Sequence, residues 1–389
     1  MKTPKVAIVH DSLTQHGGGE KVVEAILDIF PDAPVYTSVY NPATMGESFK
    51  SRAKKIITGT IGLNSTFGKF PILTKYFTFL LPLAFENFDL SEYDIIISSS
   101  SSYAKGVITR PDQLHIGYIH TPPRFLYGYS VESTKRNAWY YKPVVMLVDH
   151  YLKVWDYLAA QRADFLVANS QNVQKRIKKF YRRDSTVIHP PVETDFADRV
   201  YAKDSMQQPY YIAIGRFSDY KNFDLIIQAF NLLGIPLKII GTGVEEAKLR
   251  KMAKSNIEFV GRVSDEEKHR LWHNSLGYIF AGEDEDFGIV LVESLSHGIP
   301  VLAHRSGGPR EIIREGKDGM FFDSLNLESF VEKLKEFDQK VRGKKFDTEG
   351  SKKHAQKFSK EVFKKAFEKF VMERWGEKQK PTLLPLNDA

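Results

Sequence analysis

Two carboxylates near the end of the chain have a spacing that suits sugar binding. Glu285 and Glu293 stand eight positions apart and enclose Phe287-Gly288-Ile289. The apolar run 276–280 before them is typical of a buried strand, so we expect Glu285 in the loop at its carboxyl end and Glu293 one to two turns into the next helix. Carboxylates accept hydrogen bonds from sugar hydroxyls, and Gly288 lets backbone amides approach a ligand. The pattern predicts a nucleotide-sugar site, although two solvated helix carboxylates would share this spacing.

Two cations follow the predicted strand 211–214. Arg216 and Lys221 lie five residues apart on a strand-to-helix loop, where they can hold one diphosphate, Arg216 with a bidentate fork and Lys221 as a point charge. When a sugar–diphosphate bond breaks, negative charge grows on the leaving phosphate, and a metal or fixed cations must neutralise it. The pair therefore indicates phosphate chemistry, with an unrelated surface pair as the alternative.

A glycine loop and a histidine mark two strand ends in the first half of the chain. The segment His16-Gly17-Gly18-Gly19-Glu20 precedes a helical pattern, so the amides of Gly18 and Gly19 can point at a phosphate. An ordinary flexible turn is equally compatible. His120 ends a predicted strand, at the edge where α/β folds bind ligands, and its imidazole can hydrogen-bond a sugar hydroxyl. A half-buried structural histidine is the alternative.

Two further segments need interpretation. Arg262-Val263 follows the predicted strand 257–260 and offers ligand contacts, or forms an ordinary turn. Asp284 and Asp286 form an Asp-x-Asp pattern of the kind that holds a divalent metal under a nucleotide diphosphate. Because Arg216 and Lys221 supply positive charge, we interpret these aspartates as coincidental and expect no metal.

Short apolar strands alternate with longer periodic segments along the chain. This alternation predicts parallel sheets with helical crossovers. The expected strands are 5–9, 93–98, 115–120, 165–168, 210–214, 237–240, 257–260, 276–280 and 300–303. The pattern restarts after Pro190-Pro191, which forbid helix continuation. We therefore predict an α/β protein with two Rossmann-like domains, residues 1–190 and 191–358, followed by a helix within 359–377.

Composition limits the partners. The 389 residues carry 55 Lys and Arg against 48 Asp and Glu, a formal net charge of +7, so polyanions are suitable ligands. No nucleic-acid fold signature accompanies this excess, and we interpret the basic run 175–183 as the solvated face of a helix. The absence of cysteine excludes disulfides and thiolate metal sites and fits the cytoplasm.

The aromatic segment 69–85 leaves two interpretations open. It is too short and too interrupted by proline and lysine to span a bilayer. Phe70, Leu73, Phe77 and Leu80 follow helical spacing, so the segment either lies on an anionic membrane surface or forms a core helix. On the first interpretation the protein is peripheral on the inner face of the cell membrane.

Taken together, these motifs resemble retaining glycosyltransferases of family 4, which have the GT-B architecture. Glu285 and Glu293 match the family's Glu-x7-Glu signature, and Gly215-Arg216 with Lys221 match Gly-Arg-x4-Lys. The segment His120-Thr121-Pro122-Pro123-Arg124 is similar to the His-Thr-Pro-x-Arg stretch of bacterial polysaccharide and O-antigen mannosyltransferases.

The resemblance implies two Rossmann-like domains facing a central cleft, the first (1–190) binding the acceptor and the second (191–358) binding the nucleotide sugar, with the last helix crossing back to the first. It also implies metal-independent, retaining transfer of mannose from GDP-mannose to a lipid-linked oligosaccharide or polysaccharide. It assigns catalysis to His120, Arg216, Lys221 and Glu285, and donor binding to Gly18, Gly19, Arg262, Val263, Phe287, Gly288, Ile289 and Glu293.

Other functions stay open. A UDP-sugar donor would give glucosyl or N-acetylglucosaminyl transfer on the same fold. A nucleotide-sugar epimerase also uses two Rossmann halves, and a non-catalytic basic membrane-surface protein needs no active site. The acceptor, its linkage position and the oligomeric state do not follow from the sequence.

Overall fold

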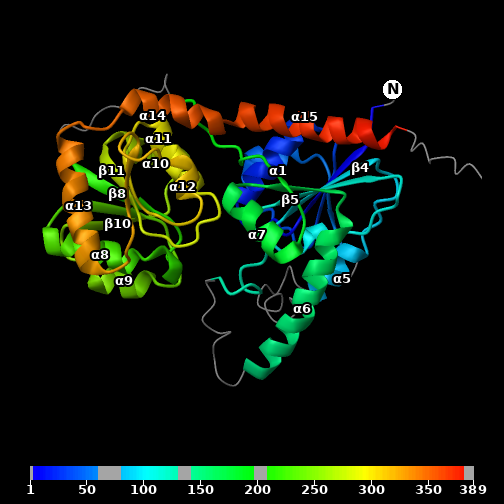
Figure 1. Cartoon of the computed structure of the whole chain (residues 1–389), viewed down its shortest axis with the longest axis horizontal. Helices are drawn as coiled ribbons and strands as arrows, with labels where there is room; N and C mark the ends of the chain where they lie inside the picture. The colour runs from blue at the N-terminus through cyan, green and yellow to red at the C-terminus, as the bar shows by residue number, and fades with distance from the viewer. Residues whose placement is uncertain (1–2, 60–79, 130–141, 197–207, 381–389) are drawn as a thin grey trace, which may run out of the picture.

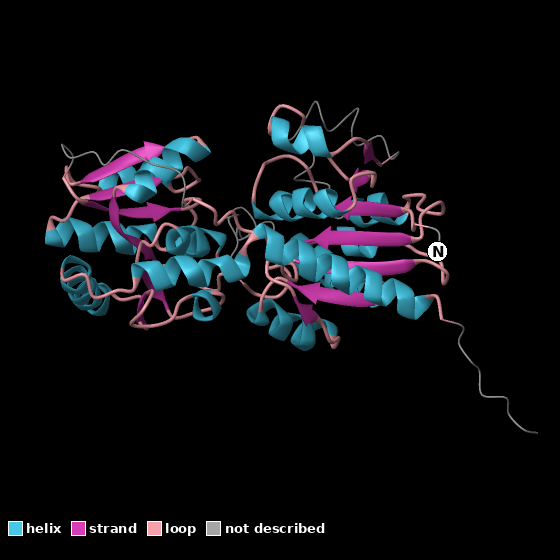
Figure 2. Cartoon of the chain, turned by 90° about the horizontal axis from the view of Figure 1, so that it is seen from above, coloured by secondary structure: helices cyan, strands magenta, loops and turns pink. Residues whose placement is uncertain are grey.

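The computed structural model describes residues 3–59, 80–129, 142–196 and 208–380. Two parallel β-sheets form two lobes that lie side by side (Figure 1). The first lobe contains strands β1 to β7 and the second contains strands β8 to β13. Seen from above, the strands of the first lobe have helices on both sides (Figure 2). Such layering is typical of doubly wound α/β folds, because parallel strands need crossover helices that cover both faces.

The first sheet has the strand order β3-β2-β1-β4-β5-β6-β7, and all its pairs are parallel. Its strands are β1 (Val6–His10), β2 (Val35–Thr37), β3 (Ile56–Thr58), β4 (Ile95–Ser100), β5 (Leu114–Ile119), β6 (Phe165–Ala168) and β7 (Thr186–Val187). The strand order reverses between β1 and β4, and ligands of open α/β sheets bind at such a point. The carboxyl ends of β1 and β4 are therefore the expected position for a site.

The second sheet repeats this arrangement with the order β10-β9-β8-β11-β12-β13. Its strands are β8 (Tyr210–Ile214), β9 (Leu237–Ile240), β10 (Ile257–Gly261), β11 (Ser275–Phe280), β12 (Val301–His304) and β13 (Gly319–Phe322). The order reverses between β8 and β11, so the loops after Ile214 and Phe280 lie at the corresponding crevice. These loops carry both the predicted cation pair and Glu285.

The helices complete the layers. In the first lobe they are α1 (Gly18–Ile29), α2 (Glu47–Arg52), α5 (Leu81–Glu86), η2 (Ala104–Gly106), α6 (Lys142–Arg162) and α7 (Gln171–Tyr181). In the second lobe they are η4 (Asp219–Lys221), α8 (Phe223–Leu233), α9 (Glu246–Met252), α10 (Asp265–His273), α11 (Ile289–Ser296), α12 (Pro309–Ile312), α13 (Leu327–Arg342), α14 (Thr348–Ala355) and η5 (Gln356–Phe358). The last helix is α15 (Lys360–Lys378).

Helix α15 leaves the second lobe and packs on the first (Figure 1). Phe363, Phe367 and Phe370 are buried in the hydrophobic core that contains β1, α1 and Tyr118 of β5. The ring centroids of Phe363 and Phe367 each lie 6.0 Å from that of Tyr118. The predicted fold is confirmed, including the helix that crosses back.

Four strands are absent from the sequence prediction: β2, β3, β7 and β13. β2, β3 and β7 contain only two or three residues, too few for an apolar pattern to stand out from the flanking loops. β13 has four residues but begins with Gly319, a residue type that is depleted in strands. All four strands extend the two sheets at their edges and do not alter the carboxyl-end crevices.

The aromatic segment 69–85 is described only in its last six residues. Phe70, Leu73 and Phe77 fall outside the described residues. In α5, Pro82, Ala84 and Phe85 are buried, whereas Leu83 is exposed. No helix in the described ranges combines the length and the apolar character that crossing a bilayer requires.

Candidate functional site

The crevice edges of the two sheets enclose a cavity of about 320 Å³. Its walls come from both lobes, and eight of the predicted site residues line it: Gly18, Gly19, His120, Lys221, Glu285, Phe287, Gly288 and Ile289. The second lobe contributes the β11–α11 loop and η4, while the first contributes the start of α1 and the end of β5. The structure thus brings together residues more than 250 positions apart in the chain.

Lys221 and Glu285 form an ion pair at the cavity wall. The Lys221 ammonium contacts the Glu285 carboxylate and lies 5.1 and 5.0 Å from the ring centroids of Tyr220 and Phe280. Burial alone would lower the pKa of Lys221, but the Glu285 carboxylate outweighs it and raises that pKa. Burial likewise opposes ionisation of Glu285, yet Lys221 lowers its pKa below the usual value. Both groups are therefore charged at neutral pH.

Glu293 lines a second cavity, of about 260 Å³, which adjoins the first. One of its carboxylate oxygens accepts hydrogen bonds from Lys268 at 3.2 Å and from Lys21 of the first lobe at 3.4 Å. Burial raises the pKa of Glu293, but these lysines, Lys268 foremost, hold it below its ordinary value. The sequence analysis missed Lys21, and the available signal was its position directly after the glycine loop, in the first turn of a predicted helix at the crevice.

The two predicted carboxylates thus face adjoining cavities. Gly18, Ile289 and Val290 line both of them. A β-carbon on Gly18 would lie 2.8 Å from the Ile289 Cδ1 atom, so a larger residue would require the Ile289 side chain to move away from this contact between the lobes. The Glu-x7-Glu spacing places its two acids on either side of this contact.

His120 belongs to a hydrogen-bonded cluster in the first lobe. Its Nε2 lies 2.8 Å from the Ser99 hydroxyl, and His10 Nδ1 lies 3.1 Å from the same hydroxyl. His10 in turn has its Nε2 3.7 Å from the buried Glu20 carboxylate. Burial first, and then the neighbouring His10, lower the pKa of His120 to about 4. At neutral pH this imidazole is uncharged and suited to hydrogen-bonding a ligand hydroxyl.

Asp11, which the sequence analysis missed, shapes the same edge. Its carboxylate accepts four backbone N–H groups, those of Ser101, Ser102, Tyr103 and Ala104, at 2.6 to 2.8 Å. The turn after β4 is thereby fixed against the end of β1, and Ser101 from this turn lines the cavity. An aspartate directly after the first strand was the available signal, because the carboxyl end of a strand in a parallel sheet lies at the crevice edge where ligands bind.

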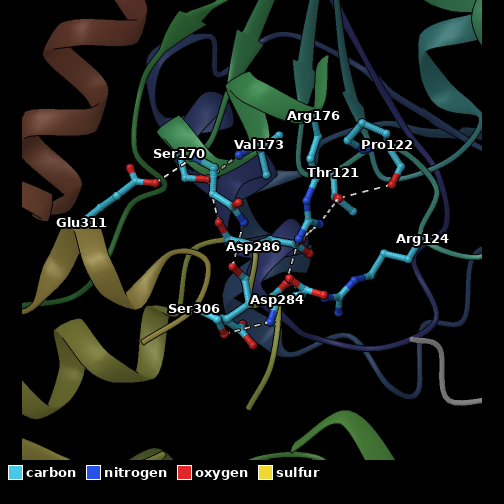
Figure 3. Close-up of polar contacts among 12 residues, drawn as sticks. Thr121, Pro122, Arg124, Ser170, Val173, Arg176, Asp284, Asp286, Ser306 and Glu311 are labelled. Atoms are coloured by element: carbon cyan, nitrogen blue, oxygen red, sulfur yellow. Dashed lines mark hydrogen bonds and ion pairs between the residues drawn. The ribbon is translucent and has the colours of Figure 1, made fainter. Parts of the chain in front are cut away.

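A polar network connects the lobes below the cavity (Figure 3). The Arg176 guanidinium contacts the Asp286 carboxylate at 2.5 Å, the Thr121 hydroxyl at 3.1 Å and the Asp284 carbonyl at 3.0 Å. Arg124 also donates to the Asp284 carbonyl. The solvated-face interpretation is wrong for Arg176, whose side chain is only 4% exposed, because it turns toward the second lobe. The charged partner of the Asp286 carboxylate is therefore the Arg176 guanidinium.

The start of α7 makes a second contact between the lobes. Glu311 accepts the backbone N–H groups of Gln171 and Asn172, each at 2.8 Å, and Ser170 donates to the Asp286 carbonyl at 2.6 Å (Figure 3). A carboxylate at a helix amino terminus satisfies free amides and matches the helix dipole. The second lobe therefore supplies an amino-terminal cap to a helix of the first.

Three predicted residues lie outside both cavity walls. Arg216 follows β8 and donates to the side chain of Gln15 at 2.9 Å, which places it at the contact between the lobes. Arg262 is exposed after β10, and Val263 is half-buried against the second-lobe core. Their predicted roles in binding stay predictions. In the described part of the chain, no three His, Asp or Glu side chains form a group that could hold a metal ion.

Sequence comparisons match both halves of the chain to glycosyltransferase families. Residues 16–196 match the profile described as Glycosyltransferase Family 4, and residues 196–345 match that of Glycosyl transferases group 1. The chain is 26% identical over 223 residues to an O-antigen chain mannosyltransferase of Escherichia coli, covering 54% of this chain and 57% of that protein. It is 24% identical over 376 residues to an alpha-1,3/1,6-mannosyltransferase of Schizosaccharomyces pombe, covering 82% and 71%.

The chain aligns with only about half the length of several of these relatives. The alignments to the Escherichia coli protein and to a core biosynthesis glycosyltransferase of Rhizobium meliloti span 57% and 54% of those proteins, little more than half their length.

Solved structures show the same fold. HepE of Anabaena in complex with UDP-glucose has a TM-score of 0.65 at 16% identity, covering 96% of this chain and all of that one. The apo form of the lipopolysaccharide outer core galactosyltransferase WaaB has a TM-score of 0.64 at 16% identity, covering 95% and 99%.

Proposed function

Because the chain is a family 4-like glycosyltransferase with the GT-B fold, we propose that it transfers mannose from GDP-mannose to a lipid-linked oligosaccharide or polysaccharide, with retention of configuration. One observation carries the proposal: the half-buried Lys221–Glu285 pair faces a cavity whose opposite wall holds His120 and the glycine loop. A fixed cation, a sugar-binding carboxylate and a neutral imidazole are thereby grouped around one space.

Each of these groups has a chemical task. The sugar C1–O bond breaks, and its electron pair passes to the diphosphate, where Lys221 stabilises the growing charge. The acceptor oxygen forms the new bond to C1 on the same face, and its proton passes to a phosphate oxygen. Glu285 positions Lys221 through their ion pair and accepts a hydrogen bond from one sugar hydroxyl. His120 hydrogen-bonds a second sugar hydroxyl. The amino terminus of α11 points its free amides at the same space.

The donor is the least constrained part of the proposal. Relatives named mannosyltransferases and the segment His120–Arg124 support mannose. HepE, solved with UDP-glucose, supports a uridine nucleotide instead. Melting temperatures with GDP-mannose, UDP-glucose, UDP-N-acetylglucosamine and an ADP-sugar separate these donors, because a ligand that binds only the folded state raises stability. We expect GDP-mannose to give the largest shift, and no shift with any nucleotide would refute a donor site.

Product analysis tests transfer and its stereochemistry. With donor and a lipid-linked acceptor, NMR of the product should show a new α-mannosyl anomeric signal. Conversion of the nucleotide sugar without any acceptor would instead identify an epimerase. A β-anomer would exclude retention.

We also propose that catalysis needs no metal, since Lys221 and Arg216 supply positive charge. Turnover should survive EDTA, and Lys221→Ala should lower it on the order of 100-fold, the usual effect of removing one preorganised charge stabiliser. Lys248→Ala, which alters an exposed ion pair on α9, is the matched control. Loss of turnover in EDTA, restored by manganese, would instead indicate that Asp284 and Asp286 bind a metal.

A further inference from the structure

Helix α6 has an exposed apolar face that the donor cleft does not use. Thirteen large hydrophobic side chains of the described residues are exposed, and seven of them lie on this one helix. They are Val144, Met146, Leu147, Tyr151, Val154, Tyr157 and Leu158. Met146 and Leu147 are each 74% exposed. An exposed apolar surface of this kind is typical of an interaction site.

The opposite face of α6 is fixed to the first lobe. Leu152, Trp155 and Ala159 are buried in a core cluster shared with η2. Asp156 on the same side forms a fully buried ion pair with Lys105. The helix is therefore apolar on two sides, and the core uses only one of them. Figure 1 shows its amino-terminal half extending beyond the strands of the first sheet.

The geometry of the outer face indicates which partner covers it. At 3.6 residues per turn, the seven side chains span an arc of about 160° and, from Val144 to Leu158, a length of about 21 Å. The exposed His150 is the one polar side chain between residues 142 and 158 that falls within this arc. A seam between two coiled helices is narrower, since it uses only two positions in seven. A broad apolar face suits a helix that lies in the plane of a membrane interface.

The charged side chains beside this face also suit an anionic membrane. Lys142 and Lys153 are the exposed charged side chains between residues 142 and 158, and by helical geometry they fall within about 40° of Met146, at one edge of the arc. Asp149 is half-buried and Asp156 is buried. Lysines beside an apolar face place their stems against hydrocarbon and their ammonium groups among lipid phosphates.

We propose that the outer face of α6 docks this protein on an anionic lipid bilayer. The inference rests on the proposed function, in which the acceptor is lipid-linked and the first lobe receives it. Docking through the first lobe would hold the cleft beside the membrane that contains the acceptor. This assigns membrane contact to α6, independently of the segment 69–79.

Vesicle co-sedimentation of the full chain tests the surface. Wild type should pellet with vesicles of phosphatidylglycerol and phosphatidylcholine at low salt, and less so at high salt, because salt screens the lysines. The double variant Leu147→Asp/Val154→Asp should partition at least about tenfold less, because both side chains leave the apolar interface. Leu232→Asp/Val244→Asp changes two equally exposed apolar residues of the second lobe and should bind as wild type does. Melting temperatures establish that all variants are folded.

The outcomes separate this inference from the donor assignment. If wild type does not pellet, or if the α6 variant pellets equally, α6 is not a membrane surface. If sedimentation velocity finds a wild-type dimer that Leu147→Asp/Val154→Asp converts to monomer, a second copy covers the face and the proposal is wrong. The melting shift with nucleotide sugars is measured without vesicles, so it reports the donor site whichever result α6 gives.

Discussion

At the scale of single residues, the charged groups of the cleft occur in pairs of opposite sign. Lys221 pairs with Glu285, while Lys21 and Lys268 share Glu293. Each group is at least partly removed from water, where an unpaired charge would lose its solvation. Pairing keeps these groups ionised and fixes their positions before any ligand arrives. Substitution of one partner therefore alters the position and the ionisation of the other as well.

The two glutamates should have separable effects. Glu293→Gln is expected to weaken nucleotide binding, because the family resemblance places this carboxylate at the ribose. Glu285→Gln should mainly lower turnover, because it loosens Lys221 and a sugar contact while leaving the nucleotide pocket in place. Calorimetric nucleotide affinity and turnover measured separately test this difference. Equal nucleotide affinity in wild type and Glu293→Gln would remove the ribose assignment.

His120 should make stability depend on pH. Its pKa is about 4 in the folded protein, against 6.5 for an ordinary histidine. Below pH 6.5 the unfolded chain takes up a proton that the folded protein refuses, so this contribution is complete above pH 6.5 and is lost as pH falls toward 4. Melting temperatures of His120→Gln should therefore fall less steeply across this range than those of wild type.

The exposed His150 on α6 gives the matched control for that experiment. His150→Gln should reproduce the wild-type pH profile. An unchanged slope in His120→Gln would mean that His120 is not kept neutral by its surroundings.

At the scale of elements, the crossing helix α15 joins the two lobes through one aromatic face. Phe367 is fully buried, stacks on Phe363 with ring centroids 5.4 Å apart, and packs against Tyr118. Tyr118 lies two residues before His120, at the end of β5. The same packing that attaches the helix thus supports the strand end that presents the histidine.

Removal of the Phe367 ring should show how much this helix contributes to the stability of the protein. Phe367→Ala should lower the free energy of unfolding by about 3–5 kcal/mol, the usual cost of deleting a buried aromatic ring. Met372→Ala, at an exposed position of the same helix, should change it by less than about 1 kcal/mol. Urea denaturation measures both. Similar losses for the two variants would show that α15 is loosely attached.

At the scale of the whole molecule, the lobes are held together by polar contacts around the loop 284–286. Arg176, Arg124 and Ser170 of the first lobe all bind this loop, and Asp286 provides its charged partner. The loop also carries Glu285, so the arrangement that joins the lobes positions a cavity residue. The contact between the lobes and the position of Glu285 are therefore coupled.

A double-mutant cycle should detect this coupling. Arg176→Met and Asp286→Asn should interact by about 1–3 kcal/mol in unfolding free energy, because they remove one contact between buried or half-buried groups. The exposed pair Lys54 and Asp32, 2.8 Å apart, is the control and should give no measurable coupling. Additive effects at Arg176 and Asp286 would show that their ion pair does not hold the lobes together.

The sequence by itself determined the fold and predicted eight of the residues that line the larger cavity. The alternation of strands and helices fixed two parallel sheets, because buried parallel strands require continuous apolar runs. Residues at strand ends, such as His120, Lys221 and Glu285, were identifiable because such sheets bind ligands at their carboxyl edges. That the last helix crosses back to the first lobe followed from the family resemblance and not from local spacing.

Only the tertiary structure decided how these residues are paired across the lobes. Local spacing carries no information on contacts between positions as distant as Lys21 and Glu293 or Arg176 and Asp286. A basic run on an amphipathic helix has the same pattern whether its cations meet water or another lobe, so Arg176 was misassigned. The division of the crevice by Gly18 and Ile289, and the exposed face of α6, depend on which surfaces meet after folding, which periodicity does not encode.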